Sequence, residues 1–125
     1  MSNDLQRFPS TLPYPFSKAI RVGDFLFLSG QIPMSADGEV VRGDIQAQTA
    51  AVMARIGETL AECGSSFDQV VKATVWLSDM RHFAGFNEVY QRHFNNGYPV
   101  RSTVSAGLAL GVDVEIEVQA WVGGR

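Results

Sequence analysis

Disulfide bonds, a membrane-spanning segment and a basic surface are features that this sequence lacks. With Cys63 as the only cysteine there is no intramolecular disulfide, and a zinc site would have to use His82, His93 and carboxylates. No apolar run approaches the roughly 20 residues of a membrane helix, and the stretch before Phe16 lacks a signal-peptide pattern. The net charge of −3 argues against nucleic acid as a partner, because phosphate binding needs clustered Lys and Arg. We therefore expect a cytoplasmic protein with no membrane partner.

The composition that remains is that of an ordinary globular protein. Hydrophobic residues make up 46% of the chain and charged residues 18%, enough apolar material for a well-packed core. A length of 125 residues fits one domain, which we place over residues 1–125. Residues 1–14 contain Pro9 and Pro13 and show no periodicity, so they are expected to form an irregular lead-in.

Strand signals recur along the chain. Apolar runs over residues 17–22 and 25–31 are joined by Gly23-Asp24, which indicates a hairpin because glycine accepts the positive φ of a tight turn. The second run begins FLFL, apolar at every position, and this predicts burial on both of its sides. Further strands are expected over residues 70–78, 100–104 and 114–121, with a short candidate over 39–42.

Two helices complete the predicted fold. The first is expected after the N-cap candidate Asp44 and before Gly64, and the second begins near Asp79. Phe83, Phe86, Tyr90 and Phe94 share one face of the second helix, and such a stripe is more often core than a cofactor site. The order of elements predicts an α+β two-layer sandwich, in which a mixed sheet carries both helices on one face.

The other face of the sheet is expected to carry an unusual mixture of side chains. Period-two alternation directs one set of polar and aromatic residues to this face: Lys72, Thr74, Trp76, Glu115, Glu117, Gln119 and Trp121. This set is too aromatic to face open water and too polar for a dry core. We therefore expect this face to be buried against another subunit, with polar groups lining crevices between chains.

Arg101 and the two glutamates of the last strand are the first candidates for chemistry. If their two strands pair, the Arg101 guanidinium can lie near Glu115 or Glu117. A guanidinium grips a carboxylate or phosphate at two points, and a neighbouring carboxylate can activate water. A structural ion pair fits the same spacing and is the commoner case. Ser29-Gly30 ends the second strand, where Gly30 permits a ligand to approach the backbone or merely marks a bulge.

Several motifs, in this order, give the chain its resemblance to a known family. They are PFSKAIRVGDFLFLSGQIP, GDIQAQT, VVKATVWLSDM, FNEVYQRHF, PVRSTV and VEIE. Each alone is weak, but together they resemble the RidA/YjgF family of enamine/imine deaminases from about Pro15 to the C-terminus.

The resemblance implies a chorismate-mutase-like protomer assembled as a homotrimer, with sites in the clefts between subunits. It also implies hydrolysis of reactive imines and enamines to 2-oxo acids and ammonia without a cofactor or metal. Arg101 matches the family's carboxylate-binding arginine and Glu115 its water-directing glutamate. The substrate-binding positions that match are Ser29, Gly30 and Asn87.

Two positions depart from the family pattern, at Phe16 and Thr103. Phe16 stands where many members have tyrosine, unless Tyr14 supplies that hydroxyl, and Thr103 stands where well-studied members have cysteine. These changes bear on which imines are accepted. Alternatives within the family are a non-catalytic trimer, an RNA-acting member of the endoribonuclease or translation-inhibitor kind, and a dedicated catabolic deaminase of an aminomuconate-like product.

Overall fold

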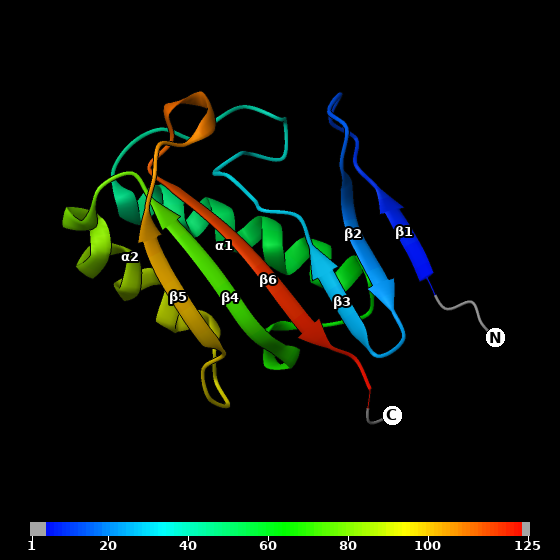
Figure 1. The fold of residues 1–125 in the computed structure, drawn as a ribbon. Coiled ribbons are helices and arrows are strands. Elements are labelled where there is room, and N and C mark those ends of the chain that lie inside the picture. The colour runs from blue at the N-terminus through cyan, green and yellow to red at the C-terminus, as the bar shows by residue number, and fades with distance from the viewer. Residues whose placement is uncertain (1–4, 124–125) are drawn as a thin grey trace.

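A computed structural model describes residues 5–123 and contains one mixed six-stranded sheet with two helices (Figure 1). The strands lie in the order β1-β2-β3-β6-β4-β5, and only β4 and β5 run parallel. The bounds of the strands are β1 Leu5–Pro9, β2 Ser17–Val22, β3 Phe25–Leu28, β4 Val70–Leu77, β5 Val100–Ser105 and β6 Val114–Trp121. The predicted α+β class is confirmed.

Helix α1 (Ile45–Glu62) begins and ends where its capping residues predict. The Asp44 carboxylate accepts a hydrogen bond from the Ala47 N–H at 2.8 Å, which satisfies one of the free donors of the first turn. Gly64 follows the helix with φ +79°, a conformation that favours glycine. Helix α2 (Phe83–Tyr90) is shorter than the pattern suggested, because 3₁₀ turns over Met80–His82 and Gln91–His93 flank it.

The core lies between the sheet and the two helices, both of which cover the same face (Figure 1). On this face Ala73, Val75 and Leu77 of β4 pair with Val118, Ile116 and Val114 of β6, and all six are buried. Burial of an aliphatic side chain of this size contributes about 1.5–3 kcal/mol. The helices meet this surface with their own apolar stripe, which includes Val52, Met53, Ile56, Leu60 and Phe86.

The opposite face of the sheet carries no helix, and we call it the open face. Phe25, Phe27 and Trp121 lie on it with 47%, 41% and 43% of their surfaces exposed. The prediction that the FLFL strand is buried on both sides is therefore wrong for a single chain, in which only Leu26 and Leu28 face the helices.

Three further details differ from the sequence-based expectation. The segment expected to be irregular contains β1, which pairs antiparallel with β2 and ends at Pro9, where an edge strand tolerates the missing N–H. Residues 39–42 form no strand and contribute only an isolated bridge between Met34 and Val40. Strands β5 and β6 do not pair, because β4 lies between them.

Candidate active site

Arg101 lies on β5, at the edge of the sheet, beneath α2. Its register partner is Ala73 of β4, whose side chain faces the helices, so the Arg101 side chain also points to the helix-covered face. Its guanidinium donates a hydrogen bond from Nη1 to Asn87 Oδ1 at 2.8 Å. The rings of Phe83, Phe86 and Tyr90 surround it, with 5.7, 5.4 and 5.0 Å between its Cζ and the ring centroids. The aromatic stripe of α2 therefore packs the core and also holds a cation.

The guanidinium has no carboxylate partner within the described part of the chain. Cation–π contacts and one neutral amide hold it in place and leave its charge uncompensated. A half-buried cation of this kind is suited to binding an anion, because a guanidinium presents several donors in one plane.

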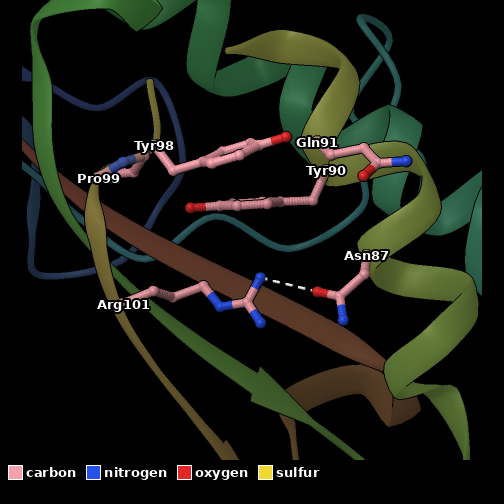
Figure 2. Close-up of a pocket in the computed structure, with 6 residues that line it drawn as sticks. All are labelled: Asn87, Tyr90, Gln91, Tyr98, Pro99 and Arg101. Carbon is pink, nitrogen blue, oxygen red and sulfur yellow. Dashed lines mark hydrogen bonds between the residues drawn. The ribbon is translucent and has the colours of Figure 1, made fainter.

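A pocket of about 350 Å³ opens beside this arginine (Figure 2). It lies between α2 and the start of β5, and its lining residues are Asn87, Tyr90, Gln91, Tyr98, Pro99 and Arg101. Figure 2 shows the hydrogen bond from Arg101 to Asn87 and the two tyrosine rings above the guanidinium. We call Asn87, Tyr90 and Arg101 the arginine half-site.

Glu115 lies in a second cluster, on the open face of β6. Its carboxylate is packed so closely against Gly30 that a Cβ on residue 30 would fall on Oε2, and Glu115 Cδ lies 3.2 Å from that Cβ position. Partial burial raises the pKa of the Glu115 carboxyl, and the charge of Glu117, two residues further on, raises it again. Ser29 precedes Gly30. We call Ser29, Gly30 and Glu115 the glutamate half-site.

The two half-sites of one chain lie on opposite faces of the sheet. Trp76 of β4 pairs with Glu115 on the open face. Ala73 and Val75 of the same strand pair with Arg101 and Thr103 on the helix-covered face. Two strand spacings, about 9–10 Å, also separate β6 from β5. The hypothesis that Arg101 meets Glu115 or Glu117 within one chain, as a catalytic or a structural pair, is therefore wrong.

The remaining predicted site residues divide between the two clusters. Thr103 shares the face of Arg101, and its Oγ1 is buried without a hydrogen-bond partner among the residues described. Ser29 donates its hydroxyl to the Ser17 carbonyl at 2.6 Å, so it braces the strand end against β2. Phe16 directly precedes Ser17, is 45% exposed, and stacks on Tyr14 with 6.2 Å between ring centroids. The backbone of Phe16 therefore adjoins Ser17, the residue whose carbonyl accepts the Ser29 hydroxyl.

A polar network anchors the start of β6, the strand that carries Glu115. Asp113 accepts hydrogen bonds from Ser78 Oγ at 2.6 Å and Gln48 Nε2 at 3.0 Å, which tie β6 to the end of β4 and to α1. The Ser78 hydrogen bond is the main cause of a lowered Asp113 pKa; the Gln48 bond and the charges of His82 and Arg81 add to it, against the effect of burial. Because Ser78 donates to the carboxylate and not to the imidazole, this group is not a hydrolase triad.

Tyr90, Gln91, Tyr98 and Pro99 line the pocket, although sequence reasoning did not select them. Tyr90 was assigned to the core with its phenylalanine neighbours, and its hydroxyl was the signal that distinguished it. Tyr98-Pro99 directly precede the strand of Arg101, so their proximity to it could have been predicted. Among residues 5–123 no group of three or more His, Cys, Asp or Glu side chains is arranged to hold a metal ion.

Comparison with known proteins places this geometry in a family. The sequence profile described as Endoribonuclease L-PSP matches residues 9–122. A RutC family protein from Pyrococcus abyssi is 46% identical over 107 residues, covering 85% of this chain and 84% of the relative. The crystal structure of RidA from an Antarctic Psychrobacter superposes with a TM-score of 0.85 at 30% identity, covering 97% of this chain and 100% of that one.

The chain belongs to the RidA/YjgF (L-PSP) family. This confirms the resemblance seen in the motifs, and the match to solved family structures extends to the whole six-stranded sheet and both helices. A yeast relative, 43% identical over 84% of this chain and 73% of its own length, is named as mitochondrial. No helix within residues 5–123 is long and apolar enough to cross a membrane. Cytoplasmic location of this RidA-family chain stays a prediction.

Proposed function

We propose that this RidA-family protein hydrolyses 2-imino and 2-enamino acids to 2-oxo acids and ammonia, without a cofactor. The observation that supports this most directly is the state of Arg101. A half-buried guanidinium without a counter-ion among the described residues, fixed by Asn87 beside an open pocket, is arranged to receive a carboxylate from outside the chain.

The proposed reaction begins when Arg101 binds the substrate carboxylate and so fixes the neighbouring C=N carbon. Water then adds to that carbon, with Glu115 holding the water and accepting its proton. Glu115 returns the proton to the nitrogen of the resulting carbinolamine. The C–N bond then breaks and its electrons leave with the nitrogen as ammonia, while the hydroxyl oxygen loses its proton and forms the C=O bond of the 2-oxo acid. An enamine enters the same route after protonation at carbon. Because protonated imines are already electrophilic, positioning supplies much of the benefit.

The raised pKa of Glu115 suits this role. A carboxyl group whose pKa is shifted toward neutrality by burial and by Glu117 is a stronger base when ionised than an ordinary glutamate. Contact with Gly30 fixes one carboxylate oxygen, and a backbone N–H near Gly30 could help to orient the substrate. Glu117 lies on the same face two residues away and is the natural comparison for Glu115.

The division of the site between two sheet faces requires a second chain if both half-sites act on one substrate. We infer that the protein is a homotrimer, in which the arginine half-site of one subunit meets the glutamate half-site of the next. The exposed apolar residues of the open face support burial by another copy: Phe25, Phe27, Val104 and Trp121 are each more than 40% exposed. A heterologous contact of this kind closes into a ring when its rotation matches the subunit number.

An assay of imine loss tests the proposal directly. An L-amino-acid oxidase generates the 2-imino acid from leucine, and the disappearance of the imine is followed with and without this protein. Replacement Arg101→Lys keeps the charge but loses the planar fork, and we expect it to lower kcat/KM about ten- to hundredfold. Arg92→Lys, an exposed arginine just after α2, is the matched control. Full activity in Arg101→Lys would contradict the assignment.

RNA cleavage, the activity that the family's description as an endoribonuclease names, is less well supported. On the open face Glu115 pairs with Trp76 and Glu117 with Thr74, and the chain as a whole carries a charge of −3. Binding of an RNA backbone requires clustered cations. Degradation of a single-stranded RNA by the purified protein, abolished by Arg101→Lys, would favour that activity over imine hydrolysis.

A further inference from the structure

The pocket beside Arg101 is much larger than the carboxylate group that we propose this arginine binds. Its volume is about 350 Å³, within the range of about 300–1,000 Å³ that is typical of sites enclosing a whole small molecule. A carboxylate fills only a small part of this space, since one water molecule takes up about 30 Å³ of the liquid. The rest of the pocket is therefore available to the side chain of the substrate, on which the proposed reaction places no demand.

The walls around this remaining space carry no charge. Among the described residues that line the pocket, Arg101 is the only charged one, and Asn87 is occupied as its hydrogen-bond partner. The other lining residues are uncharged, and three of the four present rings: Tyr90, Gln91, Tyr98 and Pro99. A charged substrate side chain would lose its hydration here without finding a counter-ion in these walls, which is costly. An apolar side chain would bury its surface against the rings, which is favourable.

Tyr98 is the ring in this wall that remains free to make a new contact. It is 65% exposed, whereas Tyr90 is buried within the aromatic stripe of α2. Figure 2 shows the Tyr98 side chain extending from the segment before β5 toward α2. A side chain exposed to this degree contributes little to the stability of the free chain, so its replacement should leave the fold intact.

The backbone and one ring contact hold Tyr98 in this position. Pro99 follows it directly and restricts its backbone to extended conformations. The ring of Phe94 packs edge-on against the Tyr98 ring, with 6.2 Å between their centroids. A ring held in this way is pre-organised for binding, because little conformational entropy is lost when a ligand covers it.

We propose that Tyr98 is a specificity-determining residue, whose ring binds the side chain of the imino acid that Arg101 holds by its carboxylate. The preferred substrates are then 2-imino acids with a branched or aromatic apolar side chain, ahead of those with a small or a charged one. This inference rests on the function proposed above and names the substrates of the same site. Tyr98 and Arg101 belong to one chain and lie three residues apart, so the selection does not depend on how subunits assemble.

The first test measures binding of stable product-like acids by calorimetry. We expect wild type to bind 4-methyl-2-oxopentanoate, whose side chain is branched and apolar, about tenfold more tightly than pyruvate, whose side chain is a methyl group. The acid 2-oxoglutarate, with a charged side chain, should bind no more tightly than pyruvate. Tyr98→Ala should reduce the preference for 4-methyl-2-oxopentanoate to about threefold or less. Tyr98→Phe should retain it, because the ring and not the hydroxyl makes the contact.

The second test measures hydrolysis of the imines that amino-acid oxidases produce from leucine and from alanine. Tyr98→Ala should lower kcat/KM about tenfold for the leucine imine, mainly through KM, and leave that for the alanine imine within about twofold of wild type. A merely structural role would lower both values alike. Met80→Ala is the matched control, because Met80 is also exposed, at 43%, but is not among the residues that line the pocket. It should keep the wild-type ratio between the two imines.

The outcomes separate this inference from the proposed function. An unchanged ratio between the two imines in Tyr98→Ala, or a wild-type preference for the alanine imine, would overturn the inference while the proposed function stands. Wild-type protein that binds 2-oxo acids with the preference carried by Tyr98 but hydrolyses no imine would overturn the proposed function and support the inference. Tightest binding of 2-oxoglutarate, or no binding of any of the three acids to wild type, would overturn the inference.

Discussion

Replacing Gly30 by alanine should separate catalysis from stability more sharply than any change to a charged residue. The added Cβ would fall on the Glu115 Oε2 atom and lie 3.2 Å from Cδ and 3.4 Å from Cγ. The atom in the way is the end of a flexible side chain, so the carboxylate can turn aside. Holding a side chain off its preferred rotamer costs about 0.5–1.5 kcal/mol, and we expect the loss of unfolding free energy to stay in this range.

The effect on turnover should be much larger. To clear the new methyl group the Glu115 carboxylate must move by about an ångström or more, and a displacement of that size costs about a hundredfold in rate when the group positions a reacting water. We expect kcat/KM for the imine to fall about a hundredfold. The mass of the assembled oligomer and the affinity of the arginine half-site for 2-oxobutyrate, a stable product-like acid, should change little.

Gly107→Ala provides the control for this variant. No atom lies within 4 Å of the Cβ that this substitution adds, so it should alter neither stability nor turnover. The assay is imine loss at fixed oxidase activity, with thermal unfolding measured on the same preparations. If Gly30→Ala keeps kcat/KM within about threefold of wild type, Glu115 does not position the water, and the glutamate half-site has been misassigned.

Other predictions concern the two glutamates, the cysteine and the assembly. Because burial and Glu117 raise the Glu115 pKa, kcat/KM should decrease on acidification, and this decrease should begin at a higher pH than with an ordinary glutamate. Glu117→Gln should move this acidic decrease to lower pH, and Glu115→Gln should abolish it. The same raised pKa means that the folded chain binds this proton more tightly than the unfolded chain. The Glu115 contribution to the free energy of unfolding should therefore increase as pH falls toward 4.5, the ordinary pKa of a glutamate, and Glu115→Gln should remove this increase in pH-dependent denaturation. Cys63 should be dispensable, so Cys63→Ser should keep full activity. The residue is 7% exposed; burial raises the pKa of its thiol, the charge of Glu62 raises it further, and that of Lys18 opposes this. Iodoacetamide should therefore react slowly with the native protein at neutral pH. Light scattering should give three times the 13.7 kDa chain mass at micromolar concentration, and a single-chain mass would contradict the homotrimer.

The faces of individual strands could be predicted from the sequence because alternation reports them directly. Val114, Ile116, Val118 and Ala120 are buried as the period-two pattern of β6 indicates, and this part of the prediction required no knowledge of the partner strands. The limits of α1 were equally accessible, since the side chain of Asp44 caps its first turn.

The relation between strands was not accessible in the same way. Alternation assigns the residues of one strand to its two faces, but it does not show which of these faces continues which face of the neighbouring strand. The opposite orientations of Arg101 and Glu115 therefore follow only from the pairing of their strands with β4. Insertion of β6 between β3 and β4 depends on contacts far apart in sequence. The strand that ends at Pro9 was missed because Pro9 and Pro13 suggested irregular backbone, although Pro13 lies outside β1.

The placement of Arg101 and Glu115 on opposite faces of one sheet has a genetic consequence. In the proposed trimer, a subunit that has lost its arginine can still lend an intact glutamate to its neighbour. Two impaired variants, Arg101→Lys and Glu115→Gln, should therefore complement one another when they are co-expressed or unfolded and refolded as a mixture. With random assembly, roughly one cleft in four would receive both intact half-sites. A heterozygous cell would retain part of the activity that either allele alone has lost.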